Sequence, residues 1–170
     1  QVDGVFEMES FVDDLQKEIN TYLTELSRKA VTEDESKEIF SMIYIVSNLE
    51  RIGDHCENIA KLCKRRTEYG IEFSEGGREE LNLIYHHTLM YLQTIIEALV
   101  ETPEDLMERV RAYEPQLNAM RLEMRIHHME RLQSAACSAD AGLIFVDMLT
   151  SFEKIGDHAY NIAESLSGIK

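Results

Sequence analysis

The sequence predicts an all-helical protein built from two tandem helical bundles, and three observations support this fold class. The chain of 170 residues contains only two prolines and eight glycines, which is few for a turn-rich β architecture. Apolar residues recur at steps of three and four, which is the period of an amphipathic helix. A motif of eleven residues occurs once in each half, as a duplicated helical unit would show.

The first half is expected to hold two helices. Segment 6–26 carries one apolar stripe that we expect to be buried. The stripe consists of Phe11, Val12, Leu15, Ile19, Tyr22, Leu23 and Leu26. Thr32 and Glu35 then form a capping box, in which the hydroxyl and the carboxylate bind backbone amides at a helix start. The box predicts a second helix that reaches about Arg66.

A cluster of helix breakers separates the two halves. It contains Gly70, Ser74, Gly76 and Gly77 within eight residues. We therefore expect residues 1–72 to form a first repeat with two helices. Residues 73–170 are expected to form a second repeat with three helices.

The second half is expected to open with a helix over residues 78–101, which keep the helical period. Thr102 as N-cap and Pro103 at the first helical position predict the start of another helix, which should reach about residue 132. Pro115 removes one internal hydrogen bond and should kink that helix. Ser138 is expected to cap the last helix, which makes five in all.

Charge and cysteine content exclude several classes of function. Thirty-two acidic and 17 basic residues give a net charge of −15, which disfavours binding to nucleic acid or to anionic lipid. The three cysteines show no paired spacing, so we expect free thiols and a cytoplasmic protein. No apolar run approaches the ~18 residues that a membrane-spanning helix needs.

The repeated motif is the strongest signal in the sequence. Residues 50–60 read Glu-Arg-Ile-Gly-Asp-His-Cys-Glu-Asn-Ile-Ala, and residues 153–163 read Glu-Lys-Ile-Gly-Asp-His-Ala-Tyr-Asn-Ile-Ala. Eight of the eleven positions are identical, and the copies lie 103 residues apart. Duplication of a helical unit explains this spacing better than coincidence.

The motif has an apolar face and an acidic face when placed on a helix. Gly53 and Gly156 fall on the apolar face, and glycine there costs ~1 kcal/mol relative to alanine, so we expect a neighbouring helix to approach closely. The acidic and amide residues follow the opposite arc at four-residue steps and are expected to point outward. They are Glu50, Asp54 and Asn58 in the first copy and Glu153, Asp157 and Asn161 in the second.

The acidic face could bind metal ions. Carboxylates four residues apart repel each other, and a bridging cation would turn this repulsion into binding energy. A single such face is commonly just a solvated surface, but its repetition favours a site. An upstream pair occurs in each half, so two oxygen-rich clusters are expected. They would contain Glu9, Asp13, Glu50 and Asp54 in the first half, and Glu114, Asn118, Glu153 and Asp157 in the second, which has one charge fewer.

The histidines do not point to catalysis. His55 and His158 follow the motif aspartates, but a neighbouring residue on a helix points about 100° away, so we expect solvated or capping side chains rather than ligands. None of the six histidines has a glutamate three residues before it, which leaves a ferritin-like di-iron centre unsupported. The sequence also lacks a nucleophile elbow and a Walker motif.

The pattern Glu-Arg-Ile-Gly-Asp-x-x-x-Asn-Ile-Ala resembles the signature of the PhoU-like phosphate regulators, and the resemblance covers both halves. Members of that family have two three-helix bundles, so the resemblance implies a PhoU-like fold whose first bundle lacks its N-terminal helix. It also implies iron or zinc ions, in multinuclear clusters, at the repeated motif. The motif acids that would serve as ligands are Glu50, Asp54, Glu153 and Asp157.

The resemblance implies a non-enzymatic regulator of phosphate uptake and phosphate signalling. Segment 10–28 is most similar to the soluble tail of bacterial sodium/phosphate cotransporter-like proteins. The implied partners are a transporter membrane domain, in the same chain or in a complex on the cytoplasmic side, and a signalling kinase. An incomplete first bundle would expose its stripe, so a homodimer is expected. A metal-dependent enzyme or metal store, and a purely structural dimerisation module, remain as alternatives.

Overall fold

The structure is a computed structural model that describes residues 2–169. Its helices are α1 (Val2–Ser27), α2 (Glu33–Glu68), α3 (Glu75–Val100), α4 (Leu106–Val110), α5 (Tyr113–Gln133) and α6 (Ala139–Leu166). The described residues form no strand, and all helices except the five-residue α4 are longer than 20 residues. The all-helical prediction is confirmed, with two long helices before the glycine-containing junction and three after it.

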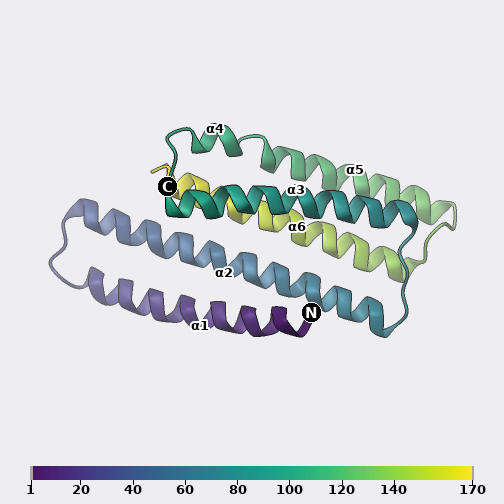
Figure 1. Cartoon of the computed structure of the whole chain (residues 1–170), viewed down its shortest axis with the longest axis horizontal. Helices are drawn as coiled ribbons and strands as arrows, with labels where there is room; N and C mark the ends of the chain where they lie inside the picture. The colour runs from purple at the N-terminus through teal and green to yellow at the C-terminus, as the bar shows by residue number, and fades with distance from the viewer. Residues whose placement is uncertain (1, 170) are drawn as a thin grey trace.

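The helices form one elongated bundle in which α2 and α6 run antiparallel at the centre (Figure 1). Helix α1 lies against α2, whereas α3 and α5 lie against α6. Residues along the whole length of α6 are buried, but Leu23 is the only buried residue of α1. The division of the chain after residue 72 stays a prediction, because α2 and α6 pack directly against each other across it.

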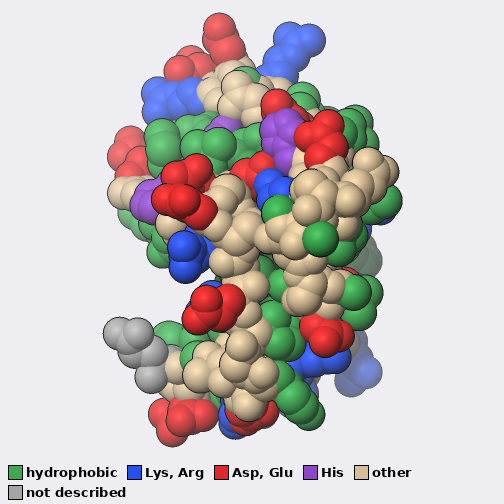
Figure 2. All heavy atoms as spheres, turned by 90° about the vertical axis from the view of Figure 1, so that its right-hand side faces the viewer, with side chains coloured by type: hydrophobic (Ala, Val, Ile, Leu, Met, Phe, Trp, Pro, Cys, Tyr) green, Lys and Arg blue, Asp and Glu red, His purple; other side chains and the backbone are tan. Residues whose placement is uncertain are grey.

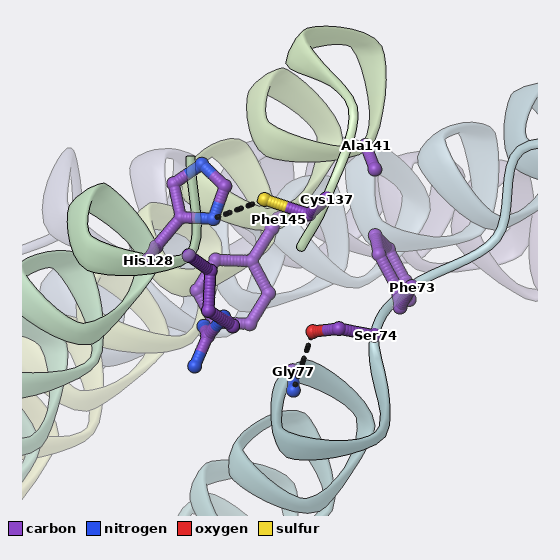
Figure 3. A pocket seen from close by; sticks show the side chains of 8 residues that line it. Phe73, Ser74, Gly77, His128, Cys137, Ala141 and Phe145 are labelled. Carbon is purple, nitrogen blue, oxygen red and sulfur yellow. Dashed lines mark hydrogen bonds between the residues drawn. The ribbon is translucent and has the colours of Figure 1, made fainter. Parts of the chain in front are cut away.

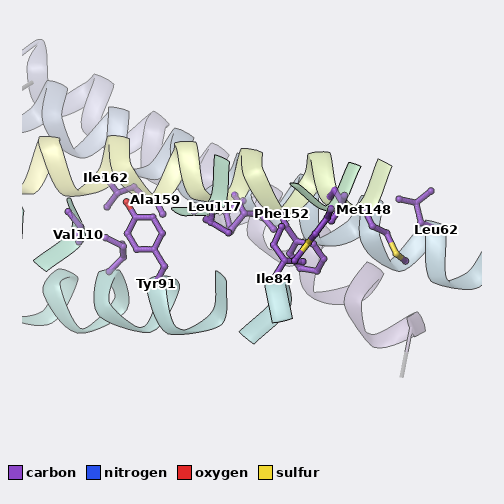
Figure 4. Close-up of a cluster of buried hydrophobic side chains, with 14 of the residues drawn as sticks. Leu62, Ile84, Tyr91, Val110, Leu117, Met148, Phe152, Ala159 and Ile162 are labelled. Atoms are coloured by element: carbon purple, nitrogen blue, oxygen red, sulfur yellow. The ribbon is translucent and has the colours of Figure 1, made fainter. Parts of the chain in front are cut away.

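The main core lies between α3, α5 and α6. Figure 4 shows Ile84 and Tyr91 of α3 beside Leu117 of α5 and Ala159 of α6. Each of these four side chains is at most 1% exposed. The periodic apolar residues of the second half therefore share one densely packed interior.

Two predicted helix caps are present in the structure. The Thr32 backbone N–H donates to Glu35 Oε2 at 2.7 Å, and the Glu35 N–H donates to Thr32 Oγ1 at 3.3 Å, which completes the capping box. Ser138 Oγ accepts the N–H of Ala141 at 3.1 Å. Local hydrogen bonding thus fixes where α2 and α6 begin.

The junction between the halves is shorter than predicted. Gly70 has a φ of 59°, which suits glycine and ends α2 in the left-handed conformation. Ser74 Oγ accepts the Gly77 N–H at 3.2 Å, so α3 begins at Glu75. The prediction that Gly76 and Gly77 break the helix was wrong, because Ser74 caps it before they are reached.

The prediction for residues 102–132 was wrong in two ways. Thr102 Oγ1 donates to the carbonyl of Ala98 at 2.9 Å, so this hydroxyl closes α3 instead of starting the next helix. Two helices, α4 and α5, replace the single kinked helix. Pro115 lies in the first turn of α5, where its missing N–H interrupts no helical hydrogen bond.

The apolar stripe predicted for the first helix is only partly buried. Leu23 is 5% exposed, but Leu15 is 42% exposed and Phe11 and Tyr22 are each 66% exposed. Helix α1 has a packed neighbour, α2, on one side only (Figure 1). Part of its apolar surface therefore remains at the outside of the molecule.

The surface agrees with the acidic composition. Figure 2 views the end formed by the α2–α3 and α5–α6 connections, and acidic side chains project from both its upper and its lower part. Within residues 2–169, no helix combines the length and the apolar character that crossing a bilayer would require.

Candidate metal centre and the paired motifs

The two copies of the motif face each other at the α2–α6 contact. The rings of His55 and His158 stack with centroids 5.6 Å apart and an interplanar angle of 22°. Asn58 Nδ2 of the first copy donates to Ser151 Oγ at 2.9 Å. These contacts relate the two copies by an approximate two-fold axis through the histidine pair.

The reciprocal contact completes this symmetry. Asn161 Nδ2 of the second copy donates to Asn48 Oδ1 at 3.2 Å. Asn48 and Ser151 each precede the motif glutamate of their own copy by two residues. Sequence reasoning missed both, although their matched positions beside the repeat could have shown them.

Asn58 is exposed as expected, whereas the expected outward position of Asn161 and the expected solvated positions of His55 and His158 were wrong. Asn161 is half-buried, and His158 Nδ1 lies 2.9 Å from Asn48 Oδ1, to which its N–H can donate. Desolvation lowers the pKa of His55 and of His158, and for His158 the His55 ring lowers the pKa further. These residues connect α2 and α6, because each helix packs against the face of the other that was expected to be in solvent.

The motif glycines permit close helix packing, but to different degrees. A Cβ atom on Gly156 would lie 2.5 Å from Leu117 Cδ1 of α5, which is shorter than a normal contact. A Cβ atom on Gly53 would lie 3.7 Å from Val12 Cγ1 of α1, which is an ordinary contact. The predicted close approach is therefore confirmed at Gly156, whereas the equivalent place in the first half has room for a methyl group.

The first acidic cluster assembles between α1 and α2. Glu9, Asp13 and Asp54 each offer a carboxylate oxygen, and these oxygens lie within 4.8 Å of one another. Desolvation, and then Asp13, raises the pKa of Glu9. Desolvation, and then Asp54, raises the pKa of Glu50. The four acids thus place repelling negative charges at one seam.

These residues fit a metal ion. Carboxylate oxygens are the ligands that hard cations prefer, and a cation among them would offset the mutual repulsion that, after desolvation, raises the pKa values of Glu9 and Glu50. Asp54 is exposed, so an ion can enter from solvent. No other group of three or more acidic, histidine or cysteine residues within residues 2–169 comes as close together. The metal-binding role of this set stays a prediction that the geometry favours.

The second acidic set carries its own cations. Lys154 Nζ lies 2.8 Å from Asp157 Oδ2 and 3.5 Å from Glu153 Oε2. Arg121 Nε lies 3.8 Å from Glu153 Oε1. The hydrogen bond to Asp157, more than any other influence, raises the pKa of Lys154. This set fits a metal ion less well, because basic side chains already balance its charge.

The upstream pair of the second half is also internally bonded. Asn118 Nδ2 donates to Glu114 Oε1 at 2.6 Å, so the amide occupies an oxygen that a metal would need. Sequence reasoning missed the roles of Lys154 and Arg121. The signal available for Lys154 was its place inside the motif, at the position of Arg51 in the first copy.

A further polar cluster lies where the α5–α6 connection meets the start of α3 (Figure 3). His128 is buried and its Nδ1 lies 3.8 Å from Cys137 Sγ. Arg131 lies over the ring of Phe145 and donates to Glu80 at 2.6 Å. Desolvation and then Arg131 lower the pKa of His128. The cluster fastens α5 to α3 and α6, and no residue pattern had predicted it.

Comparisons with known proteins agree with this architecture. A family model described as "PhoU domain" matches residues 1–63 and 81–166. A PhoU homologue of Thermotoga maritima, named as a phosphate-specific transport system accessory protein, is 28% identical over 95% of this chain and 69% of its own length. A homologue of the same description from Clostridium acetobutylicum is 23% identical over 95% of this chain and 73% of its own.

The fold is also found among solved structures. The crystal structure of PhoU from Pseudomonas aeruginosa superposes with a TM-score of 0.89 at 24% sequence identity. The match covers 97% of this chain and 78% of that one. Because the family model matches well over half of the residues, this chain belongs to the PhoU domain family.

Proposed function

We propose that this chain is a non-enzymatic regulatory domain of phosphate transport that binds a metal ion at its first acidic cluster. The observation that carries the metal-binding part is the meeting of carboxylate oxygens from Glu9, Asp13 and Asp54 within 4.8 Å. Membership of the PhoU domain family, and relatives named as accessory proteins of phosphate-specific transport systems, support the regulatory part.

The residues that would hold the ion come from two different helices. Glu9 and Asp13 belong to α1, and Asp54 belongs to α2. Glu50 adds a further nearby negative charge, since it interacts with both Asp54 and Asp13. A bound cation supplies positive charge that joins these helices, and iron or zinc is the proposed identity. Metal binding would thereby set how firmly α1 is held on α2.

The proposed partner is the membrane domain of a sodium/phosphate cotransporter-related protein, in the same chain or in a complex on the cytoplasmic side. A signalling kinase is a further proposed partner. Phe11 and Tyr22 of α1 and Phe40 of α2 are each 66% exposed, which supports a protein-binding surface in this part of the molecule. Homodimer formation through the same surface is the second arrangement that we propose.

The proposed location on the cytoplasmic side is supported by the three free cysteines, which suit a reducing compartment.

Elemental analysis tests the metal-binding part. The parent protein is purified without chelators or a histidine tag and compared with an Asp13→Asn, Asp54→Asn variant. The matched control is Asp14→Asn, Asp34→Asn, which removes two exposed acids outside the cluster. We expect stoichiometric iron or zinc in the parent and the control, and its loss from the cluster variant at unchanged helicity. Equal metal content in all three proteins, or none after loading, would refute the site.

Phosphate uptake tests the regulatory part. Cells that carry the transporter are supplied with the parent domain, the cluster variant or the matched control. The parent and the control are expected to restrain uptake of labelled phosphate, and the cluster variant to release this restraint. Uptake that is equal with and without the parent domain would contradict the regulatory role itself.

A further inference from the structure

The two acidic motifs differ in the positive charge available to them. In the second copy, Lys154 bridges Asp157 and Glu153 at 2.8 and 3.5 Å. In the first copy, Arg51 holds the same motif position, but it is exposed and forms no ion pair among residues 2–169. Arg51 still lowers the pKa of Glu50 from a distance, but among the described residues no basic side chain lies within 4 Å of the cluster acids Glu9, Asp13, Glu50 and Asp54.

The helices beside the motifs increase this difference. Val12 and Leu117 take equivalent places, because each is the neighbour that faces its motif glycine. Four residues later the first half has Gln16, whereas the second half has Arg121, whose Nε lies 3.8 Å from Glu153. A neutral residue in α1 thus corresponds to a cation in α5.

The carboxylates themselves also differ. Asp13 of the first half corresponds to Asn118 of the second, where the amide donates to Glu114 Oε1 at 2.6 Å. The second set has one carboxylate fewer and two basic side chains within 4 Å of its acids. Each of these differences lowers the negative potential that attracts a cation.

We infer that Lys154 is the resident cation of the second motif, so that a metal ion prefers the first motif and enters the second only by displacing Lys154. This inference rests on the proposed metal-binding function. The Lys154 side chain is 44% exposed, so its ammonium group can move into solvent when an ion arrives. The duplicated motif would then provide one site that fills first and one that opens at higher metal concentration.

Titration with Mn²⁺ tests the inference, because this ion favours oxygen ligands over the free thiols. Free Mn²⁺ is counted by electron paramagnetic resonance. The Asp13→Asn, Asp54→Asn background removes the first site and exposes binding at the second. In that background, Lys154→Met should tighten Mn²⁺ binding about two- to fivefold, since loss of an ion pair of up to ~1 kcal/mol frees two carboxylates.

The internal repeat supplies the matched control. Arg51→Met is made with the second site removed by Glu153→Gln and Asp157→Asn. It should change Mn²⁺ binding at the first site by less than about twofold, because Arg51 is exposed and acts on Glu50 only from beyond ion-pair distance. A second variant, Arg121→Gln, imports the side chain of the first half. It should also tighten Mn²⁺ binding at the second site, as Lys154→Met does. Melting temperatures of all variants confirm that they remain folded.

The outcomes separate the inference from the function on which it rests. If Mn²⁺ binds the first site but Lys154→Met leaves the second site unchanged, the resident-cation inference is wrong. An equal gain in the Arg51→Met control would also overturn it, because the effect would then be general charge removal. If the parent and the Asp13→Asn, Asp54→Asn variant bind Mn²⁺ equally, the proposed metal site at the first acidic cluster is itself refuted.

Discussion

The two motif copies are nearly identical in sequence, yet their surroundings differ. The copy on α6 packs tightly against α5, where Leu117 leaves no space for a Cβ on Gly156, and its acids are ion-paired. The copy on α2 has room beside Gly53, and its Asp54 lies close to Glu9 and Asp13, with no basic side chain of residues 2–169 in an ion pair with these three acids. The histidine and the asparagine by which each copy contacts the other half are the same in both, although their acceptors differ, and the neighbouring helices α1 and α5 have diverged. Duplication thus kept the helix contact and allowed the charge environment to change.

The largest expected effect concerns the motif glycines. Gly156→Ala should lower the free energy of unfolding by about 2 kcal/mol, because the new methyl group clashes with buried Leu117. Gly53→Ala should instead raise it by up to ~1 kcal/mol, since alanine favours the helix and contacts Val12 normally. Urea unfolding followed by circular dichroism measures both.

A rescue variant checks the cause of the first effect. Leu117→Val imports the smaller residue of the first half and should recover part of the stability lost in Gly156→Ala. If both glycine variants shift stability in the same direction, the packing difference between the copies is wrong.

The next effect concerns the paired acceptors at the α2–α6 contact. Asn48→Ala should cost about 2 kcal/mol, because His158 and Asn161 both donate to its oxygen and would lose their acceptor. Ser151→Ala should cost about 1 kcal/mol, since only Asn58 donates to its hydroxyl. Thermal unfolding of both variants gives the comparison, and equal losses would contradict the asymmetry.

The next prediction concerns the pH dependence of stability at one buried position. His128 of α5 and Leu23 of α1 hold equivalent positions, because each lies eleven residues after the residue that faces its motif glycine, Leu117 or Val12. Only the second half therefore has a titratable group there. Because the pKa of His128 is lowered in the folded state, its contribution is complete above its ordinary value of 6.5 and is lost as the pH falls below it. Unfolding between pH 7.5 and pH 5 should therefore show a smaller loss of stability in His128→Leu than in the parent. Parallel curves for the two proteins would refute this assignment.

The smallest effect concerns the two motif aspartates in metal-free protein, whose substitution should change the stability in opposite directions. Asp54→Asn should raise stability by a few tenths of a kcal/mol, because it relieves repulsion from Glu9 and Asp13. Asp157→Asn should lower stability by about 0.5 kcal/mol, since Lys154 loses its closest partner. Melting temperatures in chelator at low salt measure both, and added salt should reduce both shifts.

Much of the fold could be predicted because helix signals are local. Thr32 and Ser138 cap helices through hydrogen bonds to residues three positions away, so their sequence context was sufficient. Thr102 misled because a threonine hydroxyl can cap the following helix or bond back to the preceding turn. Only the packed structure, in which it bonds to Ala98, shows the second outcome.

The candidate site was predictable only in part. The spacing of Glu9 with Asp13 and of Glu50 with Asp54 placed these acids on suitable helix faces, and antiparallel packing brings three of them together. The ion pairing of Lys154 with Glu153 and Asp157 could not be predicted from spacing, because a basic residue holds this motif position in both copies. Arginine at the equivalent position of the first copy forms no ion pair within residues 2–169.

The sequence by itself determined the helical period, the caps and the duplicated motif, because each depends on residues within a few positions along one helix. The tertiary structure alone decided that His55 stacks on His158 and that Glu153 and Asp157 lie beside basic side chains, whereas Glu50 and Asp54 have none within ion-pair distance among the described residues. These properties depend on which side chains a second helix brings within about 3–4 Å, and that distance is set by packing between segments far apart in the chain.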